Sequence, residues 1–204
     1  GPYKMSRPQN AFAVVWRIVK GRHEIETVKL TVPEGFPAKK IAALFDERFQ
    51  FFDYGVFLAF APEGYLFPDT YFIPVTATAS STIELLTENF DRKTKDLEIS
   101  KEIVIMASLL EGEAKLKEER EVASGILWKR LKIGMPLQVD IERKTYEFQG
   151  LPDKPINNPG LISIEAALHP TASPFLYFLT DSTGKMHYAG TFDEHKSNIA
   201  KYLQ

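Results

Sequence analysis

The stretch that decides the fold is Ile99–Arg120, with the sequence I-S-K-E-I-V-I-M-A-S-L-L-E-G-E-A-K-L-K-E-E-R. Ser100 is a suitable N-cap, and Glu102 follows in the first turn, where the helix dipole favours an anion. The segment 103–110 is then apolar at nearly every position. Because a surface helix would show only one apolar stripe, this pattern predicts a buried helix around which the rest of the chain packs.

Two carboxylates, Glu111 and Glu113, stand at the end of this helix. Residues two apart on a helix differ by about 200° of rotation, so we expect Glu113 to lie in a cleft that Glu111 does not share. Glu113 follows the apolar face, where lost hydration raises the pKa of a carboxyl and makes it a candidate general acid. Gly112 could end the helix and leave Glu113 on a loop. The alternative is that both glutamates are ordinary surface acids at a helix end.

The composition limits the classes of function. A chain of 204 residues with 44% apolar residues suits one large or two small globular domains. The net charge of -2 gives no basic surface for nucleic acid. The chain has no cysteine, its four histidines lie in no metal-ligand spacing, and it contains no glycine-rich nucleotide loop, so we expect neither metal nor cofactor. No apolar run reaches the roughly 20 residues of a membrane span.

The N-terminal part of the chain predicts a small α+β unit. A short strand at residues 3–5, a helix over 8–21 and an alternating strand over 28–32 follow one another. A second helix is expected from Pro37, because proline suits the first helical turn. The aromatic segment 50–60 predicts core packing.

The segment Pro62–Tyr71, P-E-G-Y-L-F-P-D-T-Y, cannot form a regular helix because it contains two prolines and a glycine. Its rigid aromatic side chains would suit the wall of a sugar-binding cleft, and they would equally suit a well-packed connector. The segment also belongs to a set of stretches that resemble a known family (below), and that resemblance implies that it faces Glu113 across the cleft. Ser81 and Glu84 then predict a capping box at the start of the next helix.

The C-terminal half predicts helices joined by an irregular segment. A helix is expected over 122–133, and a loop-rich segment follows over 135–160, where function is often located. A short helix from Ser163, a hairpin over 176–189 and a last helix capped at Thr191 complete the chain.

Several of these stretches, beginning at the central helix, resemble the endolytic murein transglycosylases (MltG, or YceG-like, proteins). The segment Met106–Arg120 resembles the family pattern M-A-S-(I/L)-(I/V)-E-x-E-(A/T) followed by E-R. The resemblance runs from about Val28 to the C-terminus, and the first 33 residues are similar, more weakly, to part of a LysM-like unit. The other matching stretches are E-G-Y-L-F-P-D-T-Y at 63–71, 122–140, G-L-P at 150–152, N-P-G at 158–160, 163–170 and 177–178.

The resemblance implies an α+β fold in which residues 1–34 form a partial LysM-like domain and residues 35–204 a mixed α/β catalytic domain around the buried helix. It assigns the second glutamate of the E-x-E pattern, Glu113, as the catalytic acid. The implied substrate-binding residues are Glu63, Tyr65, Phe67, Asp69, Tyr71, Glu111, Gln138, Asp140, Tyr146 and Asn158.

The implied activity is cleavage of the MurNAc–GlcNAc bond of nascent peptidoglycan strands, leaving 1,6-anhydroMurNAc ends and ending glycan polymerisation. One carboxyl suffices, because it protonates the leaving oxygen and then accepts the proton of the tethered MurNAc 6-hydroxyl. The implied partners are glycan strands and penicillin-binding protein synthases. The enzyme would act outside the bacterial cytoplasmic membrane, anchored by an N-terminal helix that precedes the Gly1-Pro2 start, which is typical of a protease scar.

Two alternatives stay open, namely a non-catalytic glycan-binding or scaffolding module and a hydrolase that leaves reducing ends. The sequence also departs from the family pattern in two places. Gly112 stands where the family usually has a lysine, and the segment after Asp140 is shorter, retaining only Thr145 and Tyr146 of a Y-N-T-Y ending.

Overall fold

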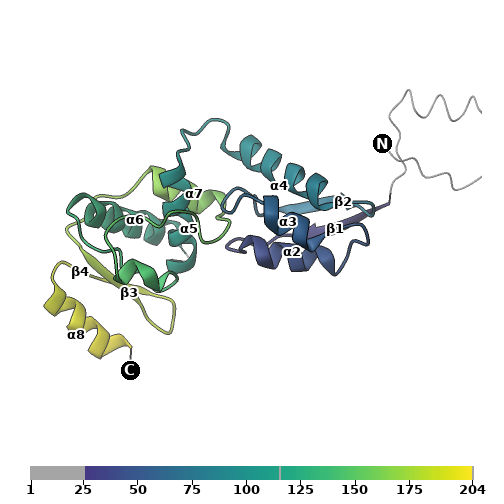
Figure 1. The fold of residues 1–204 in the computed structure, drawn as a ribbon. Coiled ribbons are helices and arrows are strands. Elements are labelled where there is room, and N and C mark those ends of the chain that lie inside the picture. The colour runs from purple at the N-terminus through teal and green to yellow at the C-terminus, as the bar shows by residue number, and fades with distance from the viewer. Residues whose placement is uncertain (1–25, 115, 204) are drawn as a thin grey trace, which may run out of the picture.

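The computed structural model describes residues 26–114 and 116–203. The strand predicted at 3–5 and the helix predicted at 8–21 lie outside these residues. The described chain forms two lobes in an elongated arrangement (Figure 1). The first lobe contains β1 (Thr27–Thr31), α2 (Ala38–Asp46), α3 (Tyr54–Phe60), β2 (Thr70–Pro74) and α4 (Ala79–Thr94). The second contains α5 (Lys101–Glu113), α6 (Lys117–Lys132), the 3-10 helix η1 (Arg143–Tyr146), α7 (Leu161–Leu168), β3 (Tyr177–Thr180), β4 (Met186–Ala189) and α8 (Phe192–Tyr202).

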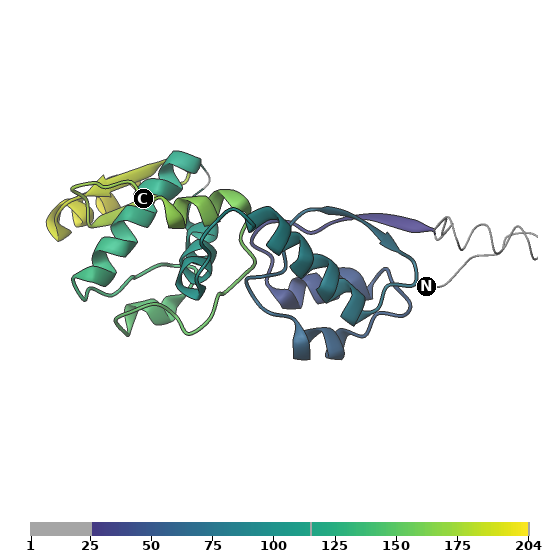
Figure 2. The same cartoon turned by 90° about the horizontal axis from the view of Figure 1, so that it is seen from above.

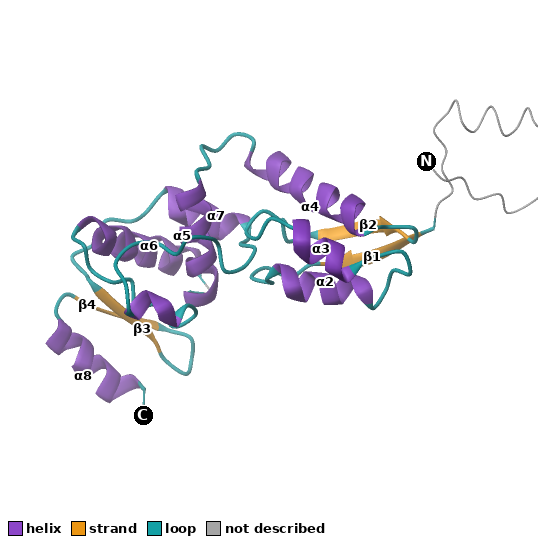
Figure 3. Ribbon diagram, viewed as in Figure 1, coloured by secondary structure: helices purple, strands orange, loops and turns teal. Residues whose placement is uncertain are grey.

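The first lobe is built on the antiparallel pair β1–β2, in which Thr27 lies opposite Pro74 and Thr31 opposite Thr70 (Figure 3). The alternating apolar residues of β1 bury Leu30 against α2, and the fully buried Phe45 and Phe57 fill the same core. The strand predicted over 28–32 is therefore confirmed, displaced by one residue. It shares its sheet and core with residues 35–90, and the domain boundary at residue 34 stays a prediction.

One local prediction for the first lobe is wrong, and another is confirmed only in part. Helix α4 is capped by Thr78, whose hydroxyl accepts from the backbone N–H of Ser81 while the Ser81 hydroxyl accepts from that of Thr78. The capping box therefore begins three residues earlier than predicted. In the segment 50–60 only some of the aromatic side chains pack in the core, since Phe51 is 58% and Phe60 is 74% exposed.

The central helix of the second lobe, α5, is buried as predicted. Its residues 104–110 are all buried, and the hydroxyl of Ser100 accepts from the backbone N–H of Ile103 at 3.4 Å. The helix continues through Gly112 and ends at Glu113, so Glu113 lies on its last turn and not on a loop. Helices α6 and α7 lie beside it (Figure 2), and together they surround the largest group of buried side chains in this lobe.

The rest of the second lobe follows the predicted order. The hairpin β3–β4 is antiparallel, and Thr191 caps α8 in a capping box with Glu194. Helix α7 starts at Leu161 after Gly160, two residues before the predicted start. Ser163, the predicted first residue, lies inside the helix and is buried. Among the described residues no helix combines the length and the hydropathy needed to cross a bilayer.

Asn158 joins the two lobes. Its backbone N–H donates to the carbonyl of Phe36, and its carbonyl accepts from the N–H of Gly35. Its side-chain oxygen accepts from the N–H groups of Gly64 and Leu66 at 2.8 and 2.9 Å. Because these groups are buried, the bonds fix the segment 62–66 against the loop before α7.

Candidate active site

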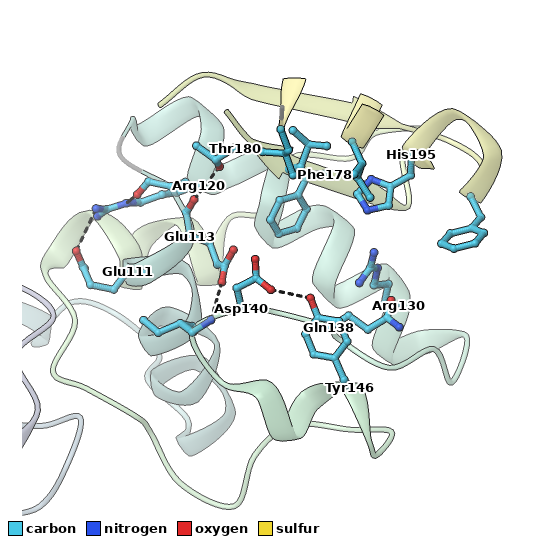
Figure 4. A pocket seen from close by; sticks show the side chains of 17 residues that line it. Glu111, Glu113, Arg120, Arg130, Gln138, Asp140, Tyr146, Phe178, Thr180 and His195 are labelled. Carbon is cyan, nitrogen blue, oxygen red and sulfur yellow. Dashed lines mark hydrogen bonds and ion pairs between the residues drawn. The ribbon is translucent and has the colours of Figure 1, made fainter. Parts of the chain in front are cut away.

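A cavity of about 890 Å³ opens in the second lobe at the C-terminal end of α5 (Figure 4). Its volume falls within the range of sites that hold small ligands or one end of a chain. Four parts of the lobe form the walls: the end of α5 with two arginines of α6, the loop 138–141 with η1, strand β3, and the inner face of α8.

Glu113 points into this cavity (Figure 4). Its carboxylate accepts from the backbone N–H of Ile141 at 3.3 Å. Burial, as the largest cause, raises the pKa of Glu113, and the charge of Asp140 raises it further, while hydrogen bonds from the loop partly oppose the shift. A raised pKa favours the protonated form of the carboxyl, which is the form that can donate a proton to a ligand.

Glu111 leaves the same helix toward the other side (Figure 4). Its carboxylate accepts from the guanidinium of Arg120 at 3.0 Å and from the N–H of Gly160 at 2.9 Å, and its side chain is 5% exposed. The expectation that Glu111 stays outside the cleft is wrong, because this residue lies at the cavity edge. Its carboxylate is nevertheless held by the ion pair, which links α5 to α6 and to the start of α7.

Gly112 allows the short loop after Asp140 to approach the helix. A Cβ atom at position 112 would lie 1.9 Å from Cδ1 of Ile141 and 3.0 Å from its Cγ1. The glycine therefore makes room for Ile141, whose N–H donates to Glu113. The two departures from the family pattern, Gly112 and the shortened segment after Asp140, therefore contact each other beside Glu113.

The loop residues Gln138, Asp140 and Tyr146 line the cavity together with Glu113, as predicted. The hydroxyl of Tyr146 donates to the Asp140 carboxylate at 2.7 Å. Burial and the contact with Asp140 raise the pKa of Tyr146 to about 12, so this phenol stays protonated near neutral pH. The hydroxyl of Thr145 accepts from the N–H of Val139 at 3.0 Å and closes the turn that carries these groups.

The segment Pro62–Tyr71 does not line the cavity, so its predicted place opposite Glu113 is wrong. Glu63 accepts from the N–H of Ala38 at 3.0 Å and from the side chain of Asn158 at 2.8 Å. Burial raises the pKa of Glu63 despite these bonds. Glu63 and Asn158 therefore serve the joint between the lobes.

The other predicted binding residues of this segment are also used internally. Tyr65 packs against an aromatic ring of α4 with ring centroids 5.1 Å apart, and Phe67 is buried. The hydroxyl of Tyr71 donates to the carbonyl of Phe67, and Asp69 pairs with Lys93 at 3.2 Å. Of the two interpretations of this segment, the well-packed connector matches these contacts.

Several cavity residues on α6, β3 and α8 were not predicted from the sequence, and four of them matter for the chemistry of the site. These are Arg130, Phe178, Thr180 and His195. The hydroxyl of Thr180 donates to the carbonyl of Glu113 at 3.3 Å. Phe178 falls in one of the stretches that resemble the family, but no local pattern marks it or the other three as cavity residues, because their positions depend on how the hairpin and α8 fold back over α5.

The second lobe thus presents, at the end of a buried helix, a desolvated carboxyl, Glu113, that points into a cavity with further polar groups, which is the arrangement of a site for acid–base chemistry. Residues 1–143 and 144–201 match the sequence profile of the YceG-like family, and the chain belongs to that family.

Named relatives and a solved structure agree with this assignment. The chain is 30% identical over 178 residues to an endolytic murein transglycosylase of Streptococcus pneumoniae, covering 69% of this chain and 32% of the relative. It is 33% identical over 174 residues to an endolytic murein transglycosylase of Bacillus subtilis, covering 69% of this chain and 48% of the relative. The chain therefore spans 32–48% of the length of these relatives.

The fold also resembles a crystal structure of a YceG-like protein from Listeria monocytogenes. The TM-score is 0.74 at 25% sequence identity, and the match covers 96% of this chain and 83% of the Listeria chain.

Proposed function

We propose that this chain forms the catalytic part of an endolytic peptidoglycan lytic transglycosylase, which cleaves the MurNAc–GlcNAc bond and leaves 1,6-anhydroMurNAc ends. The observation that carries the proposal is Glu113, a carboxyl with a raised pKa that faces a cavity. The relatives named endolytic murein transglycosylase support the reaction class.

In this mechanism Glu113 acts twice. Burial raises its pKa and so favours the protonated form, which donates to the glycosidic oxygen as the bond to C1 breaks. The resulting carboxylate accepts a hydrogen bond from the N–H of Ile141 and then takes the proton of the MurNAc 6-hydroxyl, which attacks C1. Because the hydroxyl belongs to the same sugar, no second carboxylate has to activate a water.

Hydrolysis is a second candidate, and Asp140 is the observation that favours it. Asp140 lies in the same cavity as Glu113, and the two charges interact. A pair of carboxylates on either side of a glycosidic bond is the arrangement of glycosidases that use water. Asp140 accepts from Tyr146, and the same bond would equally suit a residue that only orients the sugar.

The remaining parts of the proposal concern substrate binding by this chain and the organisation of the longer protein. Gln138, Asp140 and Tyr146 bind the glycan strand beside Glu113. Residues 1–34 belong to a LysM-like domain, an N-terminal helix anchors the protein on the outer side of the cytoplasmic membrane, and cleavage ends polymerisation by penicillin-binding protein synthases. A glycan-binding or scaffolding module without turnover is the alternative outcome.

Digestion of purified glycan strands followed by mass analysis tests the proposal. We expect 1,6-anhydro ends, which are lighter than reducing ends by one water, and no new reducing ends. Reducing ends would establish the hydrolase. Binding without any product, in folded protein, would favour the non-catalytic module.

A further inference from the structure

Arg130 and His195 form a second polar group in the cavity, on the side away from Glu111 (Figure 4). Arg130 lies in the last turn of α6, and His195 lies on α8. Both contact the ring of Tyr177, with the guanidinium carbon 5.0 Å and the imidazole 5.2 Å from its centroid. Burial and the nearby charge of Arg130 lower the pKa of His195, so the imidazole is neutral near pH 7.

Arg130 is a buried cation that has no carboxylate partner among the described residues. It is 4% exposed, and its Nε and Nη1 donate to the carbonyls of Leu176 and Leu137. In the described chain no Asp or Glu oxygen lies within 4.0 Å of its guanidinium, whereas the other cavity arginine, Arg120, pairs with Glu111. Buried arginines are normally paired, so this guanidinium retains the capacity to bind an anion.

His195 adds a second unused group. Its Nδ1 is buried and has no hydrogen-bond partner within the described residues. A buried polar atom without a partner is destabilising. Because Nδ1 is fully buried, the imidazole has to turn before a ligand oxygen in the cavity can satisfy it. In the neutral imidazole Nδ1 donates to an oxygen in one tautomer. A guanidinium and an imidazole N–H on the same side of a cavity match an oxyanion.

We propose that Arg130 and His195 form a subsite for a carboxylate carried by the glycan strand, while Glu113 acts on the neighbouring glycosidic bond. The subsite rests on the proposed function. Peptidoglycan strands carry carboxylates on the lactyl group of MurNAc or on the peptide attached to it. Asp140 repels such a group and Arg130 attracts it, so the charges of the cavity fix the direction in which the strand lies.

The test compares four soluble substrates. They are peptide-bearing strands with free or with amide-blocked carboxyl groups, and peptide-free strands with a free or an amide-blocked lactyl carboxyl. We expect wild-type protein to prefer the free form in one of the two pairs by roughly 10- to 100-fold in kcat/KM, mainly through KM. The pair that responds identifies the source of the carboxylate. Equal rates within both pairs would overturn the subsite.

Variants test which residues cause the preference for strands with free carboxyl groups. Arg130→Gln should lose the preference, so that free and blocked strands are cleaved at equal rates by folded variant. Lys132→Gln, which removes an exposed charge from the same helical turn, should keep it. If Arg130→Gln does not fold, His195→Phe preserves a stacked ring and should still weaken the preference. A preference that survives in both variants would contradict the assignment.

Failure of the proposed function gives a different result, because no substrate form would be cleaved. The same four forms can then be titrated by calorimetry into the Glu113→Gln protein. Tighter binding of a free form would support the subsite independently of cleavage, and equal affinities would reject it.

Discussion

Glu63 in the first lobe and Glu113 in the second are both carboxyls whose pKa is raised by burial, but their surroundings differ. Glu63 accepts from the N–H of Ala38 with both oxygens and also from Asn158. Glu113 faces a cavity and accepts a bond of 3.3 Å from Ile141. A raised pKa therefore reports burial, and open space beside the carboxyl separates the candidate acid from the structural one.

The largest expected effect comes from Glu113→Gln. The amide cannot donate to the glycosidic oxygen or accept from the 6-hydroxyl, so cleavage should fall by about 10²–10⁴-fold. The unfolding free energy should change by at most about 1–2 kcal/mol, because the amide is nearly isosteric and no charge is buried. Mass analysis of the products and thermal unfolding measure the two effects. Anhydro ends formed at a rate near wild type by folded variant would remove Glu113 from the mechanism.

Glu111→Gln should act mainly on stability. It leaves the Arg120 charge buried without its anion, and breaking such a pair costs about 3 kcal/mol. Cleavage per folded molecule should fall less than in Glu113→Gln. Urea denaturation with activity normalised to folded protein tests this, and Glu118→Gln on the exposed first turn of α6 is the matched control. Full loss of cleavage at unchanged stability would instead place Glu111 in the chemistry.

Asn158→Ala should weaken the joint between the lobes. The variant loses the amide oxygen that accepts from Gly64 and Leu66 and the amide nitrogen that donates to Phe36 and Glu63. We expect the unfolding free energy to fall by about 2–3 kcal/mol, since buried partners are left unsatisfied.

The control for this change is Asn198→Ala, which removes a single bond to the carbonyl of Tyr188 and should cost less than about 1 kcal/mol. Similar losses of stability in both variants, measured by chemical denaturation, would show that the Asn158 network does not hold the lobes.

Gly112→Ala tests the contact between the helix and the short loop. The new methyl group requires Ile141 to move, while the helical preference of alanine offsets part of the cost by about 1 kcal/mol. Displacing the donor of Glu113 should lower cleavage by about tenfold or less. Adding Ile141→Ala should restore the rate, because alanine keeps the backbone N–H, and Ile141→Ala alone is the control. A double variant as slow as Gly112→Ala would exclude this steric explanation.

The smallest effect is the pH dependence of stability. A carboxyl whose pKa is higher in the folded state adds stability below its unfolded pKa and loses it as the pH rises through the folded pKa. Wild-type protein should therefore lose stability relative to Glu113→Gln as the pH rises from 4.5 through the raised pKa of Glu113.

Cleavage should decline over the same pH range, because it needs the protonated acid. Wild-type protein should also lose stability relative to Glu63→Gln as the pH rises, because the pKa of Glu63 is raised too. The pH profile of cleavage by Glu63→Gln should match that of the wild type. A shifted pH profile of cleavage in Glu63→Gln would contradict the assignment of Glu63 as structural and Glu113 as the acid.

Local sequence patterns predicted much of the fold. The apolar run 103–110 and the cap at Ser100 gave α5, and the alternating residues of β1, the hairpin and the Thr191 capping box were also recovered. These features depend on neighbours within a few residues, which is the range over which helical period, strand alternation and caps act.

The sequence by itself also indicated the family, through the motifs that resemble it, and it favoured Glu113, because a carboxyl after a nearly all-apolar helix loses hydration where that helix is buried. Only the tertiary structure decided what surrounds the carboxyl. It placed Pro62–Tyr71 between the two lobes and paired Glu111 with Arg120. It also brought Arg130 and His195 to the cavity from α6 and α8. Such assignments follow from contacts between segments far apart in the chain, and no local pattern encodes which partner a polar side chain will meet.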